Sequence, residues 1–127
     1  MELGKIQKAW VKSLREHPER QCKNRLGYKE GSSYRACCLG EGLLTVCRMN
    51  KKKLPFLITG EISDKINRDC LQFSYKKLGL LDDNGRFGAF KYNDQQSLAQ
   101  LNDNGYTWTE IADFIEKYPN IVFNKSV

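Results

Sequence analysis

The chain has 127 residues, 40% of them hydrophobic and 28% charged, and its formal net charge is +6. This length predicts one globular domain over residues 1–127, because domains of about 100–150 residues are the most common. No run approaches the roughly 18 apolar residues that cross a bilayer, and the first residues lack the apolar core of a secretion signal, so we expect a cytoplasmic protein with no membrane partner. The positive charge favours an anionic partner such as a nucleotide, nucleic acid or an acidic protein.

The first predicted helix covers residues 5–16. Its apolar residues recur at steps of three and four, which is the period of one buried face: Leu3, Ile6, Trp10 and Leu14. A basic row has the same spacing and is either a solvated face or a stripe that faces phosphate: Lys5, Lys8, Lys12 and Arg15. His17 precedes a proline, which disfavours further helix there.

Residues 19–33 are polar and basic and predict a loop or a loose hairpin around Gly31. An aromatic ring beside arginines can stack on a base, although tyrosines can equally cover the edge of a core with their hydroxyls in water. If a ligand site exists, we expect the arginines to contact phosphate and a tyrosine to stack on a base. The candidate residues are Arg25, Tyr28, Tyr34 and Arg35.

The apolar stretch from residue 36 to 47 suits a buried helix and a buried strand equally well. Together with Cys22 it contains four cysteines that could in principle hold zinc, but Cys37 and Cys38 are adjacent, whereas zinc ligand pairs are usually separated. We therefore expect buried, reduced cysteines that pack as small hydrophobic side chains, and we expect no metal and no cofactor.

In the second half, Lys51, Lys52 and Lys53 indicate a solvated turn, and a helix is predicted over residues 63–77, ending at Gly79. The stretch 82–85 is a turn signal, and the alternation that follows predicts a strand over residues 86–92.

The most fully specified stretch is 98–119. A turn is expected at residues 102–105, and Thr107 with Glu110 has the spacing of a capping box that begins a helix over residues 108–118. The two acidic turns do not match a calcium loop, because the first ligand position would be Leu80 or Gln100.

Several short motifs, taken as a set over nearly the whole chain, resemble a group of small, mostly uncharacterised bacteriophage and prophage proteins. They are Trp10, the Cys37-Cys38-Leu39-Gly40 motif closed by Cys47, Leu78-Gly79-Leu80, and Leu101-Asn102-Asp103-Asn104-Gly105 followed by Ile111-Ala112. The resemblance implies a phage context, hence a host-cell cytoplasm and a role in counteracting host defence, and it implies no catalytic residues.

The expected fold class is α+β, with main helices at about 5–16, 63–77 and 108–118 around a small antiparallel sheet or hairpins. The favoured function is non-enzymatic binding of an anionic ligand, a nucleotide or a nucleotide-derived signal. The alternatives are an inhibitor of a host protein that docks through the apolar edge of the last helix, with a homo-oligomer left open, and a sequence-independent nucleic-acid binder. A small hydrolase that uses Asp103 or Glu110 is the enzymatic alternative.

Overall fold

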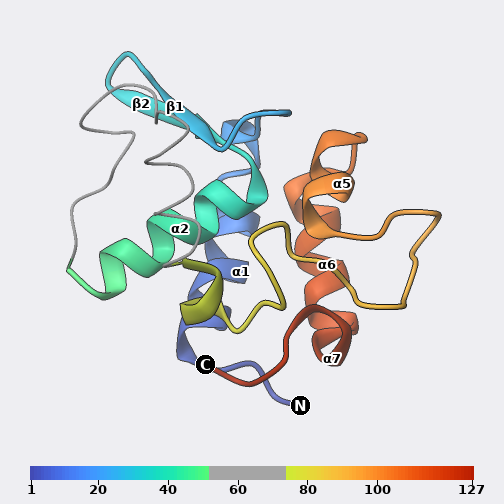
Figure 1. The fold of residues 1–127 in the computed structure, drawn as a ribbon. Coiled ribbons are helices and arrows are strands. Elements are labelled where there is room, and N and C mark those ends of the chain that lie inside the picture. Colours follow the sequence, from blue (N-terminus) through green and yellow to red (C-terminus); the bar gives the residue numbers. More distant parts are fainter. Residues whose placement is uncertain (52–73) are drawn as a thin grey trace.

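The computed structural model describes residues 1–51 and 74–127, and its architecture is α+β, as predicted (Figure 1). A small antiparallel hairpin lies above helices that pack on one another, and the two chain ends lie close together. The elements in chain order are α1 (Lys5–Glu16), the 3-10 turn η1 (Pro18–Arg20), β1 (Gly27–Glu30), β2 (Ser33–Ala36), α2 (Cys38–Met49), α5 (Leu98–Asp103), α6 (Trp108–Lys117) and α7 (Pro119–Val122).

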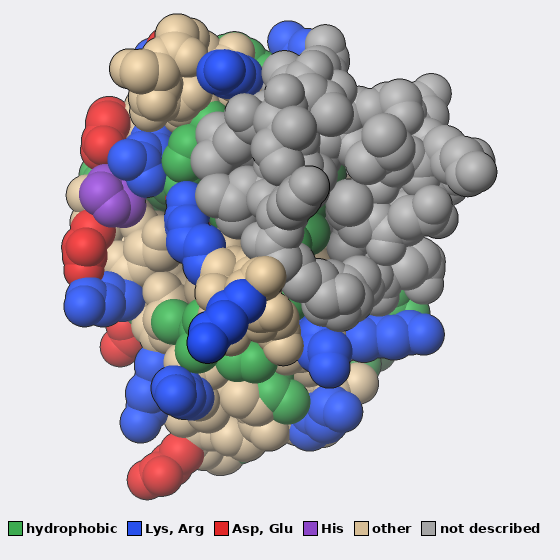
Figure 2. Space-filling model, turned by 90° about the vertical axis from the view of Figure 1, so that its left-hand side faces the viewer, with side chains coloured by type: hydrophobic (Ala, Val, Ile, Leu, Met, Phe, Trp, Pro, Cys, Tyr) green, Lys and Arg blue, Asp and Glu red, His purple; other side chains and the backbone are tan. Residues whose placement is uncertain are grey.

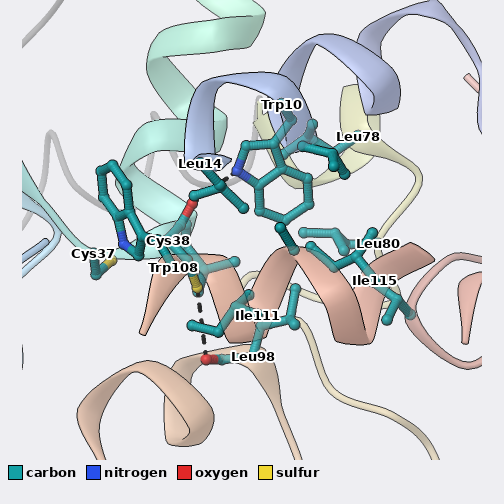
Figure 3. Close-up of a cluster of buried hydrophobic side chains, with 14 of the residues drawn as sticks. Trp10, Leu14, Cys37, Cys38, Leu78, Leu80, Leu98, Trp108, Ile111 and Ile115 are labelled. Atoms are coloured by element: carbon teal, nitrogen blue, oxygen red, sulfur yellow. Dashed lines mark hydrogen bonds between the residues drawn. The ribbon is translucent and has the colours of Figure 1, made fainter. Parts of the chain in front are cut away.

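The hydrophobic core lies where α1 packs against both α2 and α6 (Figure 3). Trp10 and Leu14 of α1 are fully buried, as are Ile111 and Ile115 of α6. The indole Nε1 of Trp10 donates a 2.9 Å hydrogen bond to the carbonyl of Cys38, so this buried polar atom is satisfied. α1 has the bounds that were predicted, residues 5–16, and the apolar residues whose spacing predicted it lie on its buried side.

The apolar stretch left open between helix and strand is helical, as α2. Two glycines in it allow neighbouring segments to approach closely. A Cβ atom on Gly40 would collide with the carbonyl oxygen of Leu26, and one on Gly42 would lie 3.0 Å from the Trp10 ring. The cysteines of this stretch are buried, which confirms that they pack as small hydrophobic side chains: Cys37, Cys38 and Cys47.

The predicted strand over residues 86–92 is wrong. Only isolated bridges join Arg86 to Ser97 and Tyr92 to Gln95. Gly88, at a φ of 68°, breaks the extended backbone within this stretch. The aromatic side chains here gather on one side, against α6, where Phe87 and Tyr92 each lie 4.9 Å from the Phe114 ring. The packing of these rings against α6 therefore outweighs the alternation of residues along the chain that predicted a strand.

Both predicted turns are present, with Gly85 at a φ of 66° and Gly105 at 102°. The capping box is also confirmed: Thr107 Oγ1 accepts from Glu110 N at 3.1 Å, and Glu110 Oε1 accepts from Thr107 N at 3.0 Å. The helix that follows ends at Lys117, one residue before the predicted end.

Most of the helix predicted over 63–77 lies outside the described residues, as do Lys52 and Lys53. Residues 74–78 are helical, and Gly79, at a φ of 79°, follows their end. The buried amide of Gln7 ties this end to the tail of the chain, since Nε2 donates to the carbonyls of Leu78 and Lys125 at 2.9 and 2.8 Å.

Candidate functional site

Three of the four candidate residues lie together, two on the outer face of the hairpin and Arg25 in the loop that precedes it. The strand register places Tyr28 directly opposite Arg35, and both side chains are half-buried. The guanidinium carbon of Arg25 lies 4.6 Å from the centre of the Tyr28 ring, a cation–π contact. We call this surface the Arg25–Tyr28–Arg35 face.

Local backbone structure explains why these side chains meet. A two-residue turn, Gly31–Ser32, joins the strands, and Gly31 takes a φ of 61°, which suits the first position of a tight hairpin turn. The loop before β1 is held by Asn24, whose backbone N–H donates to Asp103 Oδ1 at 2.8 Å. Arg25 therefore projects from an anchored loop beside the strand that holds Tyr28.

Tyr34, the fourth candidate, lies on the opposite face of the hairpin and is 5% exposed. Its hydroxyl donates to the fully buried carboxylate of Glu41, with oxygen distances of 2.7 and 2.9 Å. The same hydroxyl oxygen accepts N–H bonds from Arg20 at 3.0 Å and from Arg48 at 3.1 Å. This Tyr34–Glu41 network joins the hairpin to α2, and it directs the Tyr34 hydroxyl toward the core.

Burial and neighbouring charges determine the protonation of Tyr34 in this network. Burial raises the pKa of the Tyr34 phenol; Arg48 opposes that rise, and Glu41 adds to it. The hydroxyl therefore stays protonated near neutral pH and can donate to Glu41. Arg48 lies 3.4 Å from the Glu41 carboxylate and supplies the opposite charge that a buried carboxylate needs.

Arg35, on the outer face, is paired only weakly within the chain. Arg35 pairs with Glu30 at 3.0 Å, but the two side chains are 41% and 56% exposed, and exposed pairs contribute about 0–1 kcal/mol. Burial raises the pKa of the Cys22 thiol, while the charges of Arg25 and Arg35 oppose the rise. Both guanidinium groups therefore lie close enough to this sulfur to favour its charged form.

Two small hollows flank the face. One, of about 180 Å³, is lined by Arg25, Leu26, Cys37 and Asp103 among others. The other, also about 180 Å³, is lined by Arg20, Tyr34 and Arg35 among others. Figure 2 shows that Lys and Arg side chains are spread widely over one face of the molecule, whereas most Asp and Glu side chains there lie near its margin.

The basic row of α1 is partly paired within the chain. Arg15 donates to Asp113 at 2.8 Å and to Glu116 at 2.7 Å, both on α6, and Lys12 lies 3.7 Å from Glu16. A shallow groove of about 710 Å³ beside this row is lined by charges of both signs. The row is therefore better explained as a solvated, salt-bridged face than as a stripe for phosphate.

Two alternatives from the sequence lose support in the structure. The apolar side chains of α6 are buried against the chain itself, so the helix presents no apolar edge to a partner: Trp108, Ile111, Ala112, Phe114 and Ile115. The acids considered for hydrolysis have structural partners, Glu110 in the capping box and Asp103 at the backbone of Asn24.

The sequence did not suggest Arg20, Glu41 or Arg48 as part of the site. A signal did exist for two of them, because Glu41 interrupts an apolar run and Arg48 follows it by two helical turns on the same side of α2. The sequence also gave no sign of the role of Asn102, a fully buried amide that accepts from Cys38 N and donates to the Cys22 carbonyl.

Among residues 1–51 and 74–127, no group of three His, Cys, Asp or Glu side chains is arranged to hold a metal ion. Neither described part of the chain contains a helix long and apolar enough to cross a membrane. The chain matches no protein-family model, no curated protein and no solved structure.

Proposed function

We propose that the protein is a non-enzymatic binder of a nucleotide-type anionic ligand, which it holds on the Arg25–Tyr28–Arg35 face. The observation that carries the proposal is the stacked pair of Arg25 and Tyr28, with Arg35 directly across the hairpin. Guanidinium groups form paired hydrogen bonds with phosphate oxygens, and an aromatic ring offers a surface on which a base stacks.

The Tyr34–Glu41 network supports this face from behind. Because it joins β2 to α2 through buried hydrogen bonds, the strand that carries Arg35 is held in one position on the core. A site whose residues are held before the ligand arrives loses less conformational entropy on binding. Tyr34 thus acts as a positioning residue, and Tyr28 is the stacking residue.

In the phage context that the sequence resemblance implies, such binding would sequester a host nucleotide signal in the cytoplasm. The open form of the face equally fits a nucleotide within a single strand of nucleic acid, because stacking surfaces beside arginines are how single strands are bound without sequence preference.

The proposal is tested by isothermal titration of adenosine monophosphate into the purified protein and its variants, at low ionic strength. Arg25→Gln and Arg35→Gln should each weaken binding by about tenfold, which corresponds to about 1.4 kcal/mol. Lys29→Gln is the matched control, since Lys29 is an exposed cation on the other face of the same hairpin.

Adenosine, which lacks the phosphate, should bind much more weakly than the monophosphate. Equal losses in all three variants would show a nonspecific charge effect, and no detectable binding of the monophosphate would refute the proposal. Tyr28→Phe should bind as the wild type does, whereas Tyr28→Leu should lose the stacking contribution of about 1–3 kcal/mol.

A further inference from the structure

We propose that the Arg25–Tyr28–Arg35 face continues into a polar groove that takes a nucleoside with a phosphate on each side, Arg25 contacting one phosphate and Arg86 the other. This inference rests on the proposed function and names the class of ligand: a nucleotide phosphorylated at both ends, either a diffusible molecule or one unit of a single strand.

The groove follows from two neighbouring hollows. The hollow of about 180 Å³ beside Arg25 and a larger one of about 490 Å³ beside Arg86 share three lining residues, Asn84, Ala99 and Asp103. They are therefore parts of one groove between α5 and the turn at residues 82–86. Small-molecule sites usually have about 300–1,000 Å³, and the groove lies in that range.

The two hollows lie side by side along α5. The larger hollow is lined along α5 and just past its end, from Ala99 to Asn104. Ala99 and Asp103 also line the hollow beside Arg25, so the two hollows lie against the same part of α5. A nucleoside that crosses from one hollow to the other would have Arg25 beside one phosphate and Arg86 beside the other.

The lining of the groove has both donors and acceptors. The amides of Asn84, Gln96 and Gln100 can each donate and accept, as the edges of nucleobases require. The carboxylate of Asp103 is held in place because its Oδ1 accepts from Asn24 N and from Asn102 Nδ2. A fixed carboxylate can accept from the amino group of a base.

Arg86 is suited to exchange its present partner for a phosphate. Its side chain is 61% exposed and lies 3.9 Å from Asp82, a pair that contributes little in water. A phosphate presents several oxygens to the guanidinium fork and carries more charge than one carboxylate. The second phosphate is thus assigned to the hollow that Arg86 lines.

The test compares two ligands with the same number of phosphates, adenosine 3′,5′-bisphosphate and adenosine 5′-diphosphate. The wild type should bind the 3′,5′-bisphosphate about tenfold more tightly, because only this ligand places a phosphate at each end of the groove. Arg86→Gln should remove this preference and leave the affinity for the 5′-diphosphate unchanged. Lys91→Gln, which removes an exposed cation that does not line the groove, should leave the preference intact.

Equal affinities of the two ligands in the wild type would overturn the inference, as would a preference that survives Arg86→Gln. The proposed function fails separately, if neither ligand binds or if Arg25→Gln weakens neither. An adenylate tetranucleotide distinguishes the sources of the ligand: binding more than tenfold tighter than the bisphosphate supports a single strand in the groove, and equal binding supports a diffusible nucleotide there.

Discussion

Replacement of Tyr34 by phenylalanine should destabilise the protein strongly, because it removes the hydroxyl that donates to a fully buried carboxylate. The distances to Glu41, 2.7 and 2.9 Å, are those of a strong hydrogen bond, and bonds to charged groups contribute about 1.5–3 kcal/mol. The carboxylate would keep only Arg48, at 3.4 Å. We expect Tyr34→Phe to lower the free energy of unfolding by about 2–4 kcal/mol, measured by urea denaturation.

A double variant identifies the cause of that loss. Replacing Glu41 by methionine as well removes the buried charge at similar volume, so Tyr34→Phe/Glu41→Met should recover a large part of the stability. Tyr28→Phe is the matched control, since the Tyr28 ring lies on the outer face. Loss of its hydroxyl should change the free energy of unfolding by less than about 0.5 kcal/mol. The reasoning is refuted if Tyr34→Phe behaves like Tyr28→Phe, or if the double variant is less stable than the single one.

Gly40→Ala should destabilise the protein by about 3 kcal/mol in urea denaturation, because the added Cβ meets the Leu26 carbonyl, although helix propensity alone would favour alanine by about 1 kcal/mol. Asn102→Ala should cost about 2–4 kcal/mol, since Cys38 N and the Cys22 carbonyl lose their partner, whereas Asn104→Ala, at an exposed site, should stay within about 0.5 kcal/mol. Burial raises the pKa of the Cys37 thiol to about 12. The unfolded thiol therefore loses its proton first as pH rises above about 9, and stability should fall by about 1.4 kcal/mol per pH unit for each such thiol until the folded pKa is reached. Cys37→Ser keeps an acceptor at the start of α2 and should remove its share of that alkaline loss.

Three results would contradict these expectations. Stabilisation by Gly40→Ala would mean that the close approach to Leu26 is absent. Equal effects of the two asparagine variants would mean that Asn102 does not join the elements around it. An unchanged pH dependence in Cys37→Ser would mean that this thiol does not titrate differently in the folded and unfolded states.

The helices that could be predicted from sequence are those whose ends are marked by local chemistry. The helix of residues 108–117 begins at a capping box, so its start needed no knowledge of the rest of the chain. The segment that became α2 has no such marker. Its N-terminal cap is the sulfur of Cys37, and its helical form depends on Gly40 and Gly42 meeting distant neighbours. Neither feature can be found in local periodicity.

The candidate site was predicted as a group of residues that are close in sequence, and the structure divides that group. Neighbouring residues of a strand point to opposite faces, so Tyr34 and Arg35 cannot both lie on the outer face. Strand bounds would have been needed to apply this rule. The groove beside Arg25 could not be predicted at all, because its walls come from α5 and a turn that are brought together only by folding.

The binding of phosphate by the outer face is tested most directly at the guanidinium groups themselves. In nuclear magnetic resonance spectra that record arginine Nε–H signals, adenosine monophosphate should shift the signals of Arg25 and Arg35 in a saturable manner. The Arg15 signal should stay in place, because its guanidinium is held by Asp113 and Glu116 on α6. Shifts of all arginine signals alike, or of none, would contradict the assignment of the ligand to this face.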